Sequence, residues 1–192
     1  SQGTPGSAKD EPRRSPFPAM EEQMLAYWKE QDIFERSIRE RSPRKTFVFY
    51  DGPPFATGLP HYGHLLQSIV KDSVLRYRTM RGYRVPRRWG WDCHGLPIEN
   101  LIEKDLHLSS KRDIEAYGVD KFNAACQASV LMYEHEWKKY IDRVGRWVDF
   151  KDPYMTMKTD YIESVWWVFS ELYKKELVYR GTRVSLFCPR CS

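Results

Sequence analysis

The stretch at residues 51–64, Asp-Gly-Pro-Pro-Phe-Ala-Thr-Gly-Leu-Pro-His-Tyr-Gly-His, constrains the fold of this 192-residue chain more than any other feature. A β-branched and aromatic run, residues 46–50, precedes it. Residues 65–81 follow it with the spacing of an amphipathic helix, whose apolar face carries Leu66, Val70, Val74 and Tyr77. The glycines and prolines between them cannot continue either element. The sequence therefore predicts a buried strand, a loop and a helix, with two histidines where the helix begins.

His61 and His64 have the chemistry and the spacing of a phosphate-binding pair. The exposed backbone N–H groups and the dipole of a helix N-terminus favour an anion. Residues three positions apart share a helix face, so both imidazoles can donate hydrogen bonds to one polyphosphate. Gly63 lacks the Cβ atom that would keep a flat ring away from the backbone. The pattern predicts a nucleotide site, whereas an ordinary pair of histidines at a helix entry is the alternative.

Residues 61–64 resemble the His-x-Gly-His motif of the Rossmann-fold, class I aminoacyl-tRNA synthetases. A second stretch, Gly-Trp-Asp-Cys-His-Gly-Leu-Pro-Ile-Glu at residues 90–99, agrees with that family in order and spacing. Together the two stretches are similar to isoleucyl-tRNA synthetases rather than to their valine, leucine or methionine relatives. The resemblance runs from about Phe17 to Ser192. It implies a ligase that activates L-isoleucine with ATP and Mg²⁺ and transfers it to tRNA(Ile).

The resemblance also implies roles for individual residues. The catalytic pair would be His61 and His64, and the ATP-binding set would be Thr57, Gly58, His61, Gly63 and His64. Gly52 and Pro53 would line the amino-acid pocket, because a Pro-Pro pair is a stiff wall for a branched aliphatic side chain. Asp92 would pair with the α-ammonium group of the amino acid. A solvated loop aspartate and a plain rigid turn are the simpler interpretations of these residues.

Cys188 and Cys191 form a Cys-x-x-Cys turn, which supplies two of the four ligands that a structural zinc site requires. In the family a similar pair can be completed by a second such turn. The family's lysine-containing phosphate loop, of the Lys-Met-Ser-Lys-Ser type, does not occur in this sequence. We therefore expect a fragment of a longer synthetase, incomplete for activity on its own, with the remainder of the parent protein as a partner.

Composition and resemblance together divide the chain into four segments. Residues 1–18 are rich in glycine, proline, serine and charge, and we expect a disordered tail. Residues 19–45 are predicted to be an N-terminal helical segment. Residues 46–187 are predicted to be the first half of a Rossmann-type catalytic domain, an α/β fold with a parallel sheet. The resemblance implies that residues 188–192 begin a zinc-ribbon or editing-domain insertion.

Hydrophobic periodicity predicts further elements within the catalytic half. A strand is expected over residues 83–91 and a helix over residues 97–106. The apolar positions from Phe122 to Val144 step by three or four and predict one long helix. A largely buried helix over residues 161–175 and a strand over residues 177–184 follow.

Charge and cysteine content narrow the choice of partner and compartment. A net charge of +5 and a pI near 9.0 suit a polyanionic ligand such as ATP or tRNA, and solvation alone is equally compatible. No apolar run reaches transmembrane length, and no signal peptide is evident, so no membrane partner is expected. Four cysteines without secretory features predict a cytoplasmic protein. Two rival interpretations stay open, a valine-activating relative and a non-catalytic paralogue that binds tRNA or nucleotide.

Overall fold

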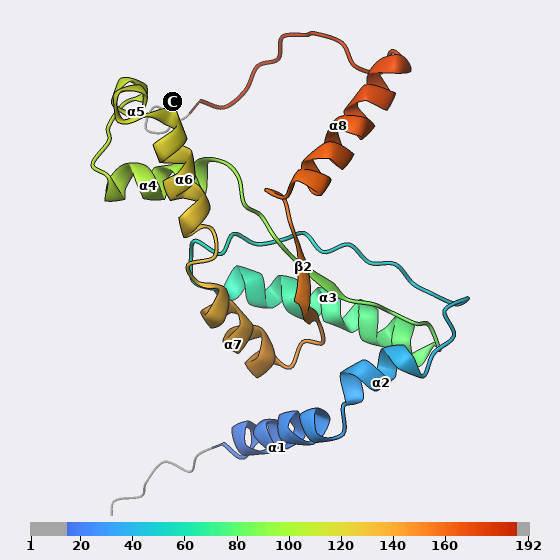
Figure 1. The fold of residues 1–192 in the computed structure, drawn as a ribbon. Coiled ribbons are helices and arrows are strands. Elements are labelled where there is room, and N and C mark those ends of the chain that lie inside the picture. Colours follow the sequence, from blue (N-terminus) through green and yellow to red (C-terminus); the bar gives the residue numbers. More distant parts are fainter. Residues whose placement is uncertain (1–14, 188–192) are drawn as a thin grey trace, which may run out of the picture. The chain divides into compact units, whose positions relative to one another are not determined.

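The computed structural model describes residues 15–187 (Figure 1). The predicted disordered tail therefore falls largely outside the described residues, as do Cys188 and Cys191. The elements in chain order are α1 (Phe17–Glu30), α2 (Ile33–Arg39), α3 (Tyr62–Met80), β1 (Arg88–Trp91), α4 (Leu96–Asp105), α5 (Lys111–Tyr117), α6 (Val119–Ser129), α7 (Glu134–Val144), β2 (Asp149–Met155) and α8 (Thr159–Lys174).

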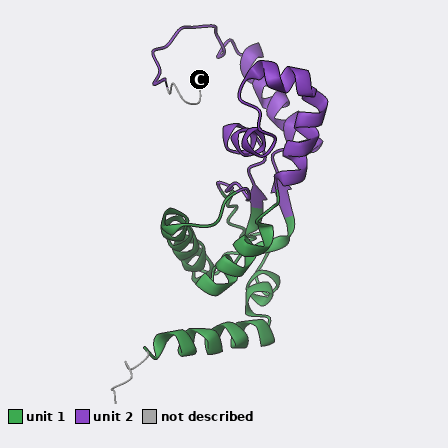
Figure 2. Cartoon of the chain, turned by 90° about the vertical axis from the view of Figure 1, so that its left-hand side faces the viewer, with its two compact units in different colours: residues 1–51, 58–89, 131–152 green, residues 52–57, 90–130, 153–192 purple. Residues whose placement is uncertain are grey.

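The chain forms two compact units (Figure 2). Unit 1 consists of Ser1–Asp51, Gly58–Trp89 and Leu131–Asp152, and it contains α1, α2, α3 and α7. Unit 2 consists of Gly52–Thr57, Gly90–Val130 and Pro153–Ser192, and it contains α4, α5, α6 and α8. Each unit has buried aromatic side chains, Trp89 and Trp137 in unit 1 and Trp91 and Phe122 in unit 2.

Strands β1 and β2 form a two-stranded parallel sheet. In unit 1, the Asp149 N–H donates to the Arg87 carbonyl oxygen at 2.7 Å. In unit 2, the Thr156 N–H donates to the Trp91 carbonyl oxygen at 3.2 Å. The pairing advances in the same direction along both strands, which confirms the expected α/β class with parallel strands.

The strand expected over residues 46–50 is wrong. Thr46 makes an isolated parallel bridge with Arg84, and residues 47–50 are irregular. Val48 and Tyr50 are 73% and 74% exposed, so this apolar run does not enter a core. Such a short pairing with one neighbour is too little to stabilise a strand. The strand expected over residues 177–184 is also wrong. These residues are irregular, and they pair with no strand among the residues that the structure describes.

Helix α3 confirms the helix that was expected after the histidines. Just beyond its last residue, Met80, Gly82 lies in the left-handed region at φ +81°, where a residue with a Cβ atom would be strained. The Gly82 N–H bonds the Thr79 carbonyl oxygen and the Tyr83 N–H bonds the Arg78 carbonyl oxygen, which is a Schellman motif. The predicted apolar face is exposed in this chain, and α3 instead buries Ser68, Leu75 and Thr79.

The single long helix expected over residues 122–144 is wrong, because a turn at residues 130–133 separates α6 from α7. At the end of α6 the Ser129 hydroxyl donates to the Cys126 carbonyl oxygen at 2.9 Å, a bond that competes with the helical pattern. Phe122 is buried in unit 2, whereas Trp137 is buried in unit 1. The apolar residues of this stretch therefore lie in the cores of both units, and the chain forms two helices instead of one.

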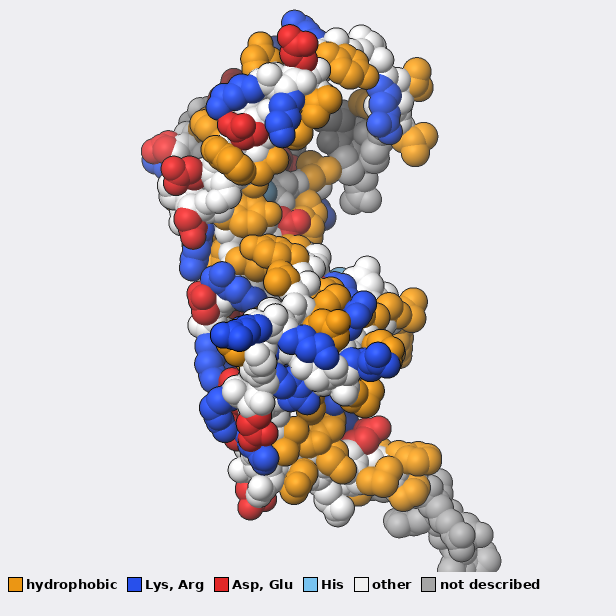
Figure 3. All heavy atoms as spheres, turned by 90° about the vertical axis from the view of Figure 1, so that its right-hand side faces the viewer, with side chains coloured by type: hydrophobic (Ala, Val, Ile, Leu, Met, Phe, Trp, Pro, Cys, Tyr) orange, Lys and Arg blue, Asp and Glu red, His pale blue; other side chains and the backbone are white. Residues whose placement is uncertain are grey.

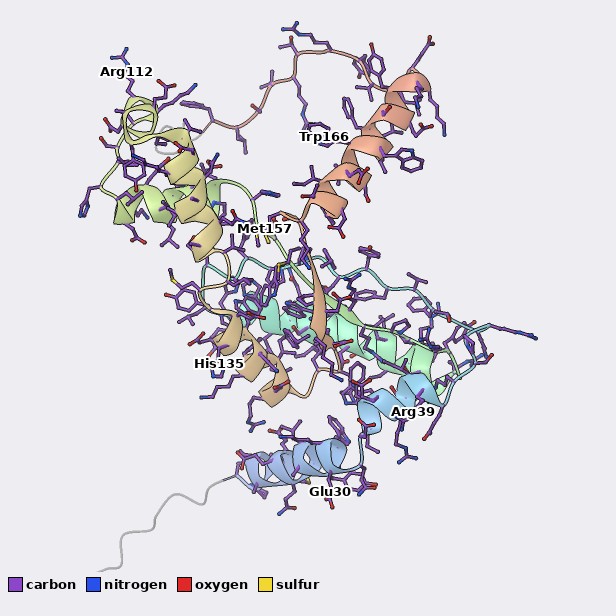
Figure 4. All side chains as sticks on the ribbon, in the orientation of Figure 1. Glu30, Arg39, Arg112, His135, Met157 and Trp166 are labelled. Atoms are coloured by element: carbon purple, nitrogen blue, oxygen red, sulfur yellow. The ribbon has the colours of Figure 1, made fainter. Side chains whose placement is uncertain are left out.

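Helix α8 forms close to its predicted bounds, but the prediction that it is largely buried is wrong. It has no buried residue, and Trp166 is 74% exposed (Figure 4). On the face of the molecule shown in Figure 3, exposed hydrophobic side chains (orange) lie among charged ones. The apolar pattern of α8 therefore predicts a helix correctly, but it does not show whether another segment packs on the apolar side chains.

Candidate functional site

His61 and His64 form a reciprocal cap at the N-terminus of α3. The Gly63 N–H donates to His61 Nδ1 at 3.1 Å, and the His61 N–H donates to His64 Nδ1, also at 3.1 Å. Because each Nδ1 accepts a hydrogen bond, the proton of each neutral ring resides on Nε2. Both imidazoles therefore carry an Nε2–H group that can donate to a phosphate oxygen.

The two rings are held together and His64 is kept neutral. Their centroids lie 3.7 Å apart with an interplanar angle of 31°. Burial lowers the pKa of His64 below its usual 6.5, and the nearby His61 and Lys71 lower it further. At neutral pH His64 thus keeps the unprotonated Nδ1 that caps the helix. A neutral imidazole with a fixed tautomer is a preorganised hydrogen-bond donor.

Gly63 is required by the ring of its own neighbour. A Cβ atom at this position would lie 2.9 Å from His61 Cε1 and 3.1 Å from His61 Nδ1. Real Cβ atoms do not approach that closely, so any other residue would displace the ring that caps the helix. Gly63 therefore leaves room for the His61 ring that caps the helix.

Trp137, on α7, supports this site, whereas its position in the apolar pattern of the sequence indicates only a helix core. Its Nε1–H donates to the Gly58 carbonyl oxygen at 2.8 Å. Its ring packs edge-on against His64 with a centroid separation of 4.7 Å. Trp137 is 2% exposed, so it is a fixed platform for both groups. No local signal predicts a contact between residues 79 positions apart in the chain.

The residues expected to bind the amino acid lie in unit 2. The Asp92 N–H donates to the Pro54 carbonyl oxygen at 2.9 Å, and Asp92 and Phe55 form a parallel bridge. The structure thus brings Asp92 to the loop that contains Gly52 and Pro53. The half-buried Asp92 carboxylate accepts a long hydrogen bond of 3.5 Å from the His94 N–H.

The expected site residues are divided between the two units. Thr57 belongs to unit 2 with Gly52, Pro53 and Asp92, whereas Gly58, His61, Gly63 and His64 belong to unit 1. Across residues 15–187, no group of three or more histidine, cysteine or acidic side chains could hold a metal ion. Within the same residues, no helix is long and apolar enough to cross a membrane.

Comparison with known proteins gives close matches. Residues 23–192 match the family model for tRNA synthetases class I (I, L, M and V). The isoleucine–tRNA ligase of Treponema denticola is 56% identical over 176 residues, which are 92% of this chain and 16% of the relative. That of Chlamydia pneumoniae is 54% identical over 178 residues, 93% of this chain and 17% of the relative.

A solved structure also matches, the ternary complex of Agrobacterium radiobacter K84 LeuRS with tRNA and LeuAMS. The match has 26% identity and a TM-score of 0.49, and it covers 84% of this chain and 18% of that chain. The chain spans 16–17% of the length of the curated relatives named above. Because the family model covers nearly all of the sequence, the chain belongs to the class I tRNA synthetases of the isoleucine, leucine, methionine and valine group.

Proposed function

We propose that the full-length protein is an isoleucine–tRNA ligase and that this chain is the N-terminal part of its catalytic domain. The observation that carries the proposal is the reciprocal histidine cap, in which two fixed Nε2–H groups stand at a helix N-terminus. Identities of 54–56% to isoleucine–tRNA ligases support isoleucine as the amino acid.

The reaction requires little covalent chemistry from the protein. The isoleucine carboxylate attacks the α-phosphorus of ATP, and pyrophosphate leaves with the electrons of the broken P–O bond. The protein must hold two anions together and stabilise the charge that accumulates on the phosphate oxygens. The Nε2–H groups of His61 and His64 would donate to those oxygens, and Mg²⁺ would enter with ATP.

The other predicted residues would orient the substrates. Thr57, Gly58 and Gly63 would place backbone close to ATP, while Gly52 and Pro53 would line the isoleucine pocket. The Asp92 carboxylate would bind the α-ammonium group, a charge-assisted contact that orients the attacking carboxylate. The isoleucyl-adenylate would then transfer its acyl group to the 3′ end of tRNA(Ile), and the broken acyl–phosphate bond would release AMP.

The longer protein would contain this chain as part of a larger catalytic domain. Residues 46–187 would be the first half of a Rossmann-type domain, preceded by the helical segment 19–45. Residues 188–192 would begin an insertion, in which Cys188 and Cys191 supply two of the four ligands of a structural zinc ion. Aminoacylation of tRNA in protein synthesis would place the protein in the cytoplasm.

ATP–pyrophosphate exchange tests this function in the full-length protein. The assay is run with isoleucine, with valine and without an amino acid, under otherwise identical conditions. The proposal predicts exchange that depends on isoleucine and is weaker with valine. A preference for valine would identify a valine-activating relative, and exchange with neither amino acid would favour a non-catalytic binding protein.

A further inference from the structure

Arg146 is a buried cation of unit 1 that the proposed reaction does not use directly. It follows Gly145, the C-cap of α7, and its N–H donates to the Ile141 carbonyl oxygen at 3.2 Å. Its side chain is 4% exposed, and its Nη2 donates to Asp51 Oδ2. Within residues 15–187, its Nε has no hydrogen-bond partner. A buried charge requires a partner of opposite sign, so the ion pair with Asp51 fixes where the guanidinium lies.

Three contacts lead from Arg146 to the histidine pair. The Arg146 Cζ atom lies 5.3 Å from the centroid of the Trp89 ring, which is the separation of a cation–π contact. The centroid of the Trp89 ring lies 6.2 Å from that of Trp137, and the centroid of Trp137 lies 4.7 Å from that of His64. Both separations are typical of packed aromatic pairs. We call Arg146, Trp89 and Trp137 the indole row.

The indole row lies within unit 1, and its rings have little room to move. Trp89 and Trp137 are 1% and 2% exposed. Phe150 packs on Trp89 with a centroid separation of 4.6 Å and an interplanar angle of 32°. In a close-packed core few voids can absorb a displacement, so a shift of one side chain moves its neighbours. A shift of Trp89 would therefore displace Trp137 and the ring of His64 that packs against it.

We propose that Arg146 is a positioning residue for His64, which it supports through Trp89 and Trp137. The inference rests on the proposed function for its consequence, because that function makes His64 a donor to the ATP phosphates. Arg146 itself does not touch the substrate. It holds the first ring of the indole row, and the row keeps the His64 ring in place. A misplaced donor stabilises the developing charge less, so the rate of isoleucine activation depends on Arg146.

The test compares Arg146→Lys with a matched control, Arg78→Lys, in the full-length protein. Lysine can keep an ion pair with Asp51, but it lacks the planar guanidinium that stacks on an indole ring. Arg78 is a half-buried arginine of α3 in unit 1, and its Cζ atom lies over Phe47 and Tyr83 instead, 4.7 Å and 5.6 Å from their ring centroids.

ATP–pyrophosphate exchange gives the first readout. Arg146→Lys should lower kcat about tenfold, because small misplacements of a catalytic group are costly. The KM values for isoleucine and ATP should change within about twofold, because the lost interaction is one that strengthens in the transition state. Arg78→Lys should match the unmodified protein in all three constants.

A double-mutant cycle shows whether Arg146 acts through His64. In a His64→Ala background, Arg146→Lys should change kcat by less than about twofold, because the side chain that Arg146 positions is already gone. A loss of about tenfold in both backgrounds would overturn the inference, because independent effects add. Arg146 would then support unit 1 in general rather than this donor.

Hydrogen–deuterium exchange of the same proteins gives a readout that does not need activity. The His61 N–H donates to His64 Nδ1, so its protection reports how firmly the His64 ring is held. In the peptide spanning residues 58–66, deuterium uptake should be about tenfold faster in Arg146→Lys and nearly unchanged in Arg78→Lys. If Arg146→Lys does not fold, Trp89→Phe reduces the ring at the centre of the row, keeps the ion pair of Arg146, and should accelerate the same peptide.

The outcomes separate this inference from the proposed function. Equal behaviour of the Arg146 and Arg78 variants would overturn the inference, as would faster deuterium uptake with an unchanged kcat. Absence of isoleucine-dependent ATP–pyrophosphate exchange in the unmodified protein would instead overturn the proposed function. Deuterium uptake over residues 58–66 would then still decide whether Arg146 holds the His64 ring.

Discussion

The residues proposed to bind phosphate, in unit 1, and those proposed to bind the amino acid, in unit 2, are held in different ways. In unit 1, the side chains of His61 and His64 are fixed by backbone N–H groups, by each other and by Trp137. In unit 2, Asp92 is held through its backbone, and its carboxylate accepts a long hydrogen bond. The first group is preorganised without a ligand, whereas the second keeps a carboxylate available for a ligand cation.

This difference has consequences for mutagenesis. A variant in the preorganised group should lose catalysis and some stability together, because the same bonds serve both. A variant at Asp92 should lose amino-acid affinity with little effect on stability.

Substitution His64→Ala in the full-length protein should lower kcat for isoleucine-dependent exchange about 10³-fold, since one preorganised donor to developing charge is removed. The free energy of unfolding should fall by about 1 kcal/mol, because the His61 N–H loses its cap. Exchange kinetics and urea unfolding measure the two effects. His135→Ala, at an exposed histidine of α7 (Figure 4), is the control and should match the unmodified protein. Unchanged exchange in His64→Ala would remove this residue from the mechanism.

Substitution Asp92→Asn should raise the KM for isoleucine about 10²-fold, because a charge-assisted contact to the ammonium group becomes a neutral one. The KM for ATP and the free energy of unfolding should stay close to those of the unmodified protein. Steady-state exchange at varied isoleucine concentration measures the effect. An equal rise in both KM values would mean that Asp92 supports the whole site rather than the amino group.

Substitution Trp137→Phe keeps an aromatic ring beside His64 and removes the donor to the Gly58 carbonyl oxygen. The loss of one buried hydrogen bond should raise the KM for ATP about tenfold. The isoleucine KM is the internal reference and should change less. A variant indistinguishable from the unmodified protein would show that the indole N–H does not contribute to ATP binding.

The smallest effect is a dependence of stability on pH that comes from His64. Its pKa is lowered in the folded state from the usual 6.5, so the unfolded chain binds a proton more readily. The contribution is present above pH 6.5 and is lost as the pH falls through the lower, folded-state value. Urea unfolding at a series of pH values should show this decline, and His64→Gln should diminish it. An identical pH profile in His64→Gln would show that His64 does not cause the decline in stability.

The local geometry of the proposed phosphate-binding residues was predictable, because these residues are close together in sequence. The spacing of His61, Gly63 and His64 predicts a helix N-terminus, and the cap forms within those residues. The hydrogen bond of Trp137 to Gly58 and the bonds that Asp51 accepts from Lys71 and Arg146 were not predictable. They join residues between 20 and 95 positions apart. Periodicity identified α3 and α8, but it reports apolar character and not the partner that covers it.

The errors in secondary structure have the same origin. A run such as residues 46–50 has the composition of a strand, but a strand also requires hydrogen-bonded neighbours, and Thr46 alone has a bridge. The stripe from Phe122 to Val144 has the period of one helix, but its ends belong to the cores of different units. Long-range pairing and the division into units are tertiary properties that local patterns do not encode.

A crystal structure of the full-length protein with isoleucine and an unreactive ATP analogue would show directly which side chains bind the phosphates and the ammonium group. We expect Nε2 of both His61 and His64 to lie about 3 Å from phosphate oxygens, the distance of a charge-assisted hydrogen bond. We also expect the isoleucine ammonium group to contact the Asp92 carboxylate. Phosphates bound away from the start of α3, with both imidazoles turned from them, would rule out this role for the histidine pair.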